Sequence, residues 1–229
     1  MKRIFAVAAG VAMAAVVAIA WAGQSEPAAP SAGEGGDAVA CANLIYAGTR
    51  SSVCFSDKFL TAVARDTTIA TARKFKAVKL ADAEVFRFPF AVMTGEGGFM
   101  LTESERINLK RYLERGGFLL ASAGCSSQPW DESFRREMQQ IFPDTKLEAI
   151  PFTHDIFHTV YDIKTLKATH GGPEPKIEGL TLGGKIVVVY SSDGLNDTST
   201  MYGCCCCGGN EVGDSQRVNA NILAYALLQ

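Results

Sequence analysis

The chain has 229 residues, of which 48% are hydrophobic and 20% are charged, and its formal net charge is −2. This length allows one well-buried domain. The near-neutral charge and the lack of a basic tract give no electrostatic support for nucleic-acid binding, so we expect no nucleic-acid partner.

The amino terminus has the pattern of an export signal. Lys2 and Arg3 precede an apolar stretch over residues 4–19, and residues 20–22 (Ala-Trp-Ala) supply the small side chains of a signal-peptidase site. We therefore predict that residues 1–22 are a signal peptide. The alternative is an uncleaved membrane anchor, because the apolar stretch approaches the length that spans a bilayer.

A linker and one domain follow the signal. Residues 23–41 are rich in Pro, Gly, Ala and Ser and lack large apolar side chains, which is typical of a flexible linker. The remainder, 42–229, is expected to be a single α/β domain. Removal of the two amino-terminal basic residues takes the net charge from −2 to −4. The expected location is periplasmic or extracellular, where disulfides persist, or the membrane if the signal is not cleaved.

The first half of this domain alternates apolar runs with one helical pattern. Residues 43–47 and 90–93 are short apolar runs that end at Gly- or Thr-Gly-containing turns, as buried strands do. Between them, Ser56 or Asp57 can cap a helix that we expect to extend to about Lys74.

The next unit has clear start and stop signals. Thr102 and Glu105 form a capping box, in which each side chain accepts a hydrogen bond from a backbone amide at the helix start. Gly116 and Gly117 end the predicted helix, and residues 118–121 form another buried strand.

The carboxy-terminal half continues the alternation. Residues 131–142 predict a helix that Pro143 ends, and 185–190 contain a β-branched run. Asp214 or Ser215 can cap a last helix. Apolar strands that alternate with helices predict a mostly parallel sheet between two helical layers, a three-layer α/β sandwich of doubly wound type.

Several segments resemble a known family. Residues 112–121 resemble the helix–Gly–Gly–strand unit of the class I glutamine amidotransferase-like fold, a flavodoxin-like architecture shared by trehalose-utilisation-type proteins. More narrowly, the domain resembles the bacterial family of domains of unknown function 4159. The segments that carry this resemblance are 115–119, 134–138, 142–143, 154–163, 188–193 and 210–212. The resemblance implies the fold but no reaction, because the family has no established activity.

Cys125 is the first candidate for chemistry. It follows a buried strand and precedes a helix, where an amidotransferase-like elbow holds its nucleophile and where α/β proteins bind ligands. The elbow pattern Gly-x-Cys-x-Gly is incomplete, because Ala123 and Ser127 stand where the two glycines would be. A catalytic Cys125 would require His154 or His158 as a base, with a third group to orient it.

His154 and His158 are also candidates by themselves. A spacing of four residues would place both imidazoles on one face of a helix, as metal ligands require. Pro151 lies just before them, and argues against a helix. We favour the alternative that one histidine hydrogen-bonds within a loop.

The most unusual feature is a run of four cysteines before a Gly-rich turn. The four are Cys204, Cys205, Cys206 and Cys207. Oxidation outside the cytoplasm favours disulfides, formed within the run or with Cys41, Cys54 or Cys125, and a Cys41–Cys54 bridge would close a short loop. Alternatively, two thiolates of the run and a histidine could bind a soft metal such as zinc or copper. The third alternative is a packed loop of reduced cysteines.

Three functional hypotheses follow. The first is a non-catalytic binding or accessory module at the cell envelope, with an envelope protein or a small molecule as its partner. The second is a cysteine-dependent hydrolase or thiol enzyme that uses Cys125. The third is a metal-binding protein centred on the cysteine run. The membrane is a partner only if the amino-terminal segment stays uncleaved.

Overall fold

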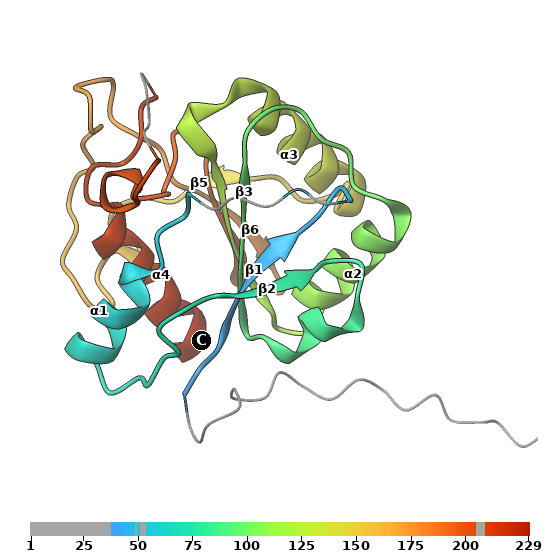
Figure 1. Cartoon of the computed structure of the whole chain (residues 1–229), viewed down its shortest axis with the longest axis horizontal. Helices are drawn as coiled ribbons and strands as arrows, with labels where there is room; N and C mark the ends of the chain where they lie inside the picture. Colours follow the sequence, from blue (N-terminus) through green and yellow to red (C-terminus); the bar gives the residue numbers. More distant parts are fainter. Residues whose placement is uncertain (1–37, 49, 51–53, 205–208) are drawn as a thin grey trace, which may run out of the picture.

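The computed structural model describes residues 38–48, 50, 54–204 and 209–229. Its described part contains seven strands and four α-helices (Figure 1). The strands are β1 (Cys41–Ile45), β2 (Lys76–Lys79), β3 (Phe90–Gly95), β4 (Phe118–Ala123), β5 (Glu148–Ala149), β6 (Glu178–Leu182) and β7 (Lys185–Ser191). The helices are α1 (Lys58–Asp66), α2 (Glu103–Glu114), α3 (Gln128–Ile141) and α4 (Ser215–Leu228).

The strands form one sheet in the order β2-β1-β3-β4-β7-β6-β5. The first five of these are parallel, whereas β6 is antiparallel to both β7 and β5. The parallel part has the strand order of flavodoxin-like doubly wound sheets. The expectation of a mostly parallel sheet is therefore confirmed, and the antiparallel strands at one end are an addition that the sequence pattern did not reveal.

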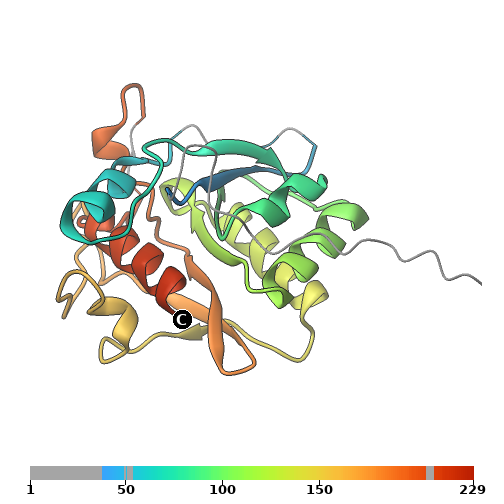
Figure 2. The ribbon, with the colours of Figure 1, turned by 90° about the horizontal axis from the view of Figure 1, so that it is seen from below.

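Helices cover both faces of the sheet, which gives three layers. Two large apolar clusters lie on its opposite faces: one includes side chains of α2 and α3, and the other includes side chains of α1 and α4. Figures 1 and 2 show the sheet between these two helical pairs. Within the described residues, none of the helices is long and apolar enough to cross a bilayer.

The expected boundaries of α2 are confirmed by its caps. The Thr102 hydroxyl accepts the Glu105 amide and the Glu105 carboxylate accepts the Thr102 amide, which completes the capping box. At the other end, Gly116 adopts φ +90° and the Gly117 amide bonds to the Tyr112 carbonyl, as in a Schellman motif. Such caps contribute about 1 kcal/mol each.

The expected length of the first helix was wrong. Helix α1 ends at Asp66 and does not continue to Lys74. Thr67 is extended, and its hydroxyl donates to the Val63 carbonyl at 2.7 Å, so this β-branched residue ends the helix in place of continuing it. The chain then runs beside the start of β1, where Thr71 bridges to Val39.

Candidate functional site

Buried polar side chains gather where the parallel strands end. Because β1, β3, β4 and β7 are parallel, their carboxyl ends lie at one edge of the sheet, which is where doubly wound proteins bind ligands. Five side chains at this edge and in the connection from β7 to α4 are almost completely buried. They are Thr94, Ser122, Asn196, Thr198 and Glu211, and we call them the carboxyl-edge cluster.

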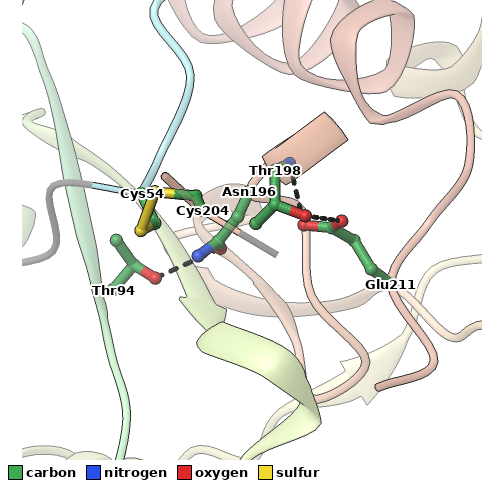
Figure 3. The surroundings of a disulfide bond; sticks show 6 residues. All are labelled: Cys54, Thr94, Asn196, Thr198, Cys204 and Glu211. Carbon is green, nitrogen blue, oxygen red and sulfur yellow. Dashed lines mark hydrogen bonds between the residues drawn. A yellow bond between two sulfur atoms is a disulfide. The ribbon is translucent and has the colours of Figure 1, made fainter. Parts of the chain in front are cut away.

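Asn196 joins two neighbouring strands to the connection that follows β7. Its Oδ1 accepts a hydrogen bond from the Ser122 hydroxyl at 2.7 Å. It also accepts one from the Thr94 hydroxyl at 3.2 Å (Figure 3). Only 2% of Asn196 is exposed. A buried amide oxygen that satisfies two hydroxyl donors fixes the ends of β3 and β4 relative to this connection.

The same connection is held at two further points. The Ser122 hydroxyl accepts the Leu195 amide at 2.7 Å. The Glu211 carboxylate accepts both the Thr198 hydroxyl, at 2.6 Å, and the Thr198 amide, at 3.3 Å (Figure 3). Leu195, Asn196, Thr198 and Glu211 are therefore held in place at the carboxyl edge.

Cys125 occupies a strained turn between β4 and α3. Its φ is +49° and that of Ser126 is +54°, in the left-handed region that non-glycine residues seldom occupy. The Ser126 hydroxyl holds the turn, because it donates to the Asp193 carbonyl at 2.7 Å and accepts the Asn210 amide at 2.6 Å. Backbone strain of this kind costs about 1–3 kcal/mol per residue and concentrates at functional sites.

Gly124, next to Cys125, is a point of close packing. A Cβ atom there would lie 3.1 Å from the Glu96 Cγ, 3.1 Å from the Gly95 carbonyl oxygen and 3.4 Å from the Asn196 Nδ2. The turn therefore packs closely against both Glu96 and Asn196. Glu96 is exposed and Cys125 is half-buried, so a carboxylate and a thiol-bearing turn are adjacent at the open side of the cluster.

His154 and His158 act within a loop and do not form a helical pair. The segment between them is a single short 3-10 turn, η3 (Asp155–Phe157). The Nδ1 of His154 accepts the Ile156 amide at 3.2 Å. In His158, Nδ1 lies 2.7 Å from an Asp162 carboxylate oxygen and Nε2 lies 2.6 Å from the Phe152 carbonyl oxygen.

The structure places these two histidines away from Cys125. The ring of His154 packs against Tyr225, and Tyr225 packs against Phe118 at the start of β4. Cys125 follows the other end of β4, about 16 Å away along a six-residue strand. The expected pairing of Cys125 with His154 or His158 is therefore not brought together.

The third histidine lies on the side of Cys125. His170 is exposed, in a loop where Thr169 donates its amide to the Glu211 carbonyl and Gly172 packs against the Asn210 side chain. Asn210 in turn contacts the Cys125 turn through Ser126.

The structure describes four of the seven cysteines. Cys54 and Cys204 form a disulfide (Figure 3). The expectation that a cysteine of the run is oxidised, with Cys54 among its possible partners, is therefore confirmed. The proposed partnership of Cys41 with Cys54 is wrong, because Cys41 is a free, fully buried thiol at the opposite end of β1. Burial raises the pKa of the Cys41 thiol to about 12.

The metal hypothesis loses one of its four candidate cysteine ligands. Cys204 is in the disulfide and supplies no thiolate, while Cys205, Cys206 and Cys207 lie outside the described residues. Within the part of the chain that is described, no three His, Cys, Asp or Glu side chains are grouped to hold a metal ion.

A separate hollow lies at the opposite edge of the sheet. It has a volume of about 460 Å³ and lies between the carboxyl ends of α2 and α3 and the β6–β7 turn, with Lys110 and Lys185 in its lining. Its apolar lining includes Leu113, Phe142 and Val187.

Comparison with known proteins identifies a family. The family model described as a domain of unknown function (DUF4159) matches residues 42–227. No curated protein is significantly similar to the chain.

Proposed function

Because the chain belongs to the DUF4159 family, which names no activity, we propose a function from its geometry: an exported domain of amidotransferase-like fold that binds a small polar molecule at the carboxyl edge of its sheet. It acts as a non-catalytic binding or accessory module at the cell envelope. The observation that carries the proposal is the close packing of Gly124 against Glu96 and Asn196, beside the strained turn at Cys125.

The carboxyl edge has the properties of a preorganised binding site. Its buried floor is fixed by the hydrogen bonds of Asn196 and Glu211, so little conformational entropy is lost when a ligand binds. Its open side presents Glu96 and the Cys125 turn, which offer polar groups for orientation. His154, one of the two bases considered for a catalytic Cys125, packs through Tyr225 toward the other end of β4, which supports binding over turnover.

The test of binding is a thermal-shift screen of small polar metabolites with two matched variants. Glu96→Gln removes one exposed charge at the carboxyl edge, and Lys110→Gln removes one at the opposite hollow. A ligand of the carboxyl edge should bind Glu96→Gln at least tenfold more weakly and Lys110→Gln as well as the wild type. The reverse pattern would place the ligand in the hollow and overturn the proposal.

Export is tested separately. The proposal requires cleavage after residue 22, so the protein recovered from the cell envelope should begin at Gly23. An intact amino terminus would instead support the uncleaved anchor. The disulfide between Cys54 and Cys204 is compatible with an oxidising compartment.

A cysteine-dependent enzyme is the second candidate. It is favoured by the strand-to-helix turn at Cys125, where two consecutive residues have positive φ, as at a strained nucleophile elbow. His170, and not His154 or His158, is then the histidine on the correct side of the sheet. Hydrolysis of an amide or ester that both Cys125→Ala and His170→Ala abolish, and His158→Ala does not, would establish this candidate in place of the first.

A further inference from the structure

The disulfide connects two segments that border the carboxyl-edge cluster. Cys54 lies just before α1 and Cys204 lies in the connection from β7 to α4, 150 residues later. Two residues after Cys54, the Ser56 amide donates to the Asn196 carbonyl at 2.8 Å. The disulfide therefore lies close to Asn196, the residue that joins β3 and β4 (Figure 3).

The disulfide attaches the end of residues 199–204 to the segment before α1, and the Ser199 hydroxyl at their start bonds back to Asp197. Their near end is held by Thr198, through the two hydrogen bonds to Glu211. Beyond that point, the amides of Met201 and Cys204 bond within the same loop, to Thr198 and Met201. Tyr202 at its tip is fully exposed, with a relative accessibility of 106%. Within the described residues, the disulfide is thus the strongest link from the far end of this loop to the body of the domain.

The two cysteines of the disulfide are partly exposed to solvent, where a thiolate could approach them. Cys54 and Cys204 are both half-buried, whereas Cys41 is completely buried in the core. Thiol–disulfide exchange requires that an attacking thiolate reach one sulfur of the bond, so exposure decides which disulfides react. A disulfide on a loop can also open without disturbing the hydrogen bonds of the central strands.

We propose that the Cys54–Cys204 disulfide is a reversible clasp that holds residues 199–204 at the carboxyl edge, and that its reduction by a dithiol opens this edge to ligand. A thiolate of the dithiol attacks one sulfur of the bond and forms a mixed disulfide, with release of the other cysteine as a thiolate that takes up a proton. The second thiol of the dithiol then displaces the first cysteine. Two electrons pass to the protein, and the dithiol leaves as a disulfide.

The ligand part of this inference rests on the proposed function, but the opening of the loop does not. The direct test is hydrogen exchange of the full mature chain, oxidised and then treated with dithiothreitol under native conditions. Reduction should accelerate amide exchange at least tenfold in residues 196–204 and 54–57. Exchange in β3 and β4, which requires unfolding of the whole domain, should remain at least tenfold slower than in these two segments.

Variants make the assignment specific. The double variant Cys54→Ser/Cys204→Ser should exchange like the reduced wild type in both segments, whether or not dithiothreitol is present. Cys125→Ser retains the clasp and should respond like the wild type. If the double variant does not fold, the reduced wild type supplies the same comparison.

Three outcomes would overturn the clasp. They are a disulfide that dithiothreitol reduces only in denaturant, exchange at 196–204 that is unchanged by reduction, and exchange in β3 and β4 that becomes as fast as in the two loop segments. The last would identify the bond as a structural brace. For a metabolite found in the screen above, the reduced protein should bind at least fivefold more tightly. Finding no such metabolite contradicts the proposed function, while the exchange data still decide the clasp.

Discussion

Replacement of Asn196 by alanine removes the one acceptor that the Thr94 and Ser122 hydroxyls share. Both hydroxyls are fully buried, and a buried hydroxyl left without its partner costs about 1–3 kcal/mol. The free energy of unfolding should therefore fall by about 2–5 kcal/mol. Urea denaturation at constant pH, monitored by fluorescence, measures this change as a shift in midpoint at unchanged slope.

A matched control variant and a double-mutant cycle distinguish this effect from the general cost of replacing a partly buried asparagine. Asn108→Ala removes a single half-buried bond, from Nδ2 to the Leu80 carbonyl, and should cost about 1 kcal/mol. In a Thr94→Val background, Asn196→Ala should cost about 1 kcal/mol less than in the wild type, because one of its two donors is already absent. The role of Asn196 as the shared acceptor would be refuted if Asn196→Ala lowered the free energy of unfolding by less than about 1 kcal/mol, or if its effect were the same in the Thr94→Val background.

Three other predictions concern the core and the disulfide. Native Cys41 should resist iodoacetamide at pH 8.5 and react in urea, because its pKa of about 12 keeps the buried thiol protonated; mass spectrometry would expose early labelling, which contradicts that burial. Loss of the Cys54–Cys204 disulfide should lower the free energy of unfolding by up to about 5 kcal/mol, the chain-entropy estimate for a 150-residue loop, and an unchanged urea midpoint would contradict it. Gly117→Ala should lower Tm by several degrees, since its Cβ would lie 2.4 Å from the buried Tyr112 ring; an unchanged Tm in calorimetry would show that the ring can move.

Local signals were sufficient to predict much of the fold. Helix α2 is one example. Its capping box at Thr102 and Glu105 and the glycine pair that follows it act through contacts within a few residues, so both ends of the helix can be predicted from the local sequence. The apolar runs at β3 and β4 are buried on both faces, and this is why they read as parallel strands. Strand β6 carries a glycine and mixed polarity, and its pairing with β7 could not be read from either segment alone.

The candidate site was only partly predictable. The position of Cys125 after a buried strand indicated the edge of the sheet at which the buried polar side chains gather. Asn196 gave no signal, because its role depends on Ser122 and Thr94, which are 74 and 102 residues away in the chain. The Cys54–Cys204 pairing was equally inaccessible, since seven cysteines allow many connectivities and their distances are set by the folded chain.

The measurement that tests the central proposal most directly is chemical-shift mapping of a small-fragment library on the ¹⁵N-labelled domain, in its oxidised form and after reduction by dithiothreitol. Binding at the carboxyl edge predicts that the largest shifts occur at Glu96, Gly124 and Cys125. The amides of Lys110 and Lys185, at the opposite hollow, should remain unchanged. Fragments that shift the hollow and leave the Cys125 turn unaffected would contradict the account.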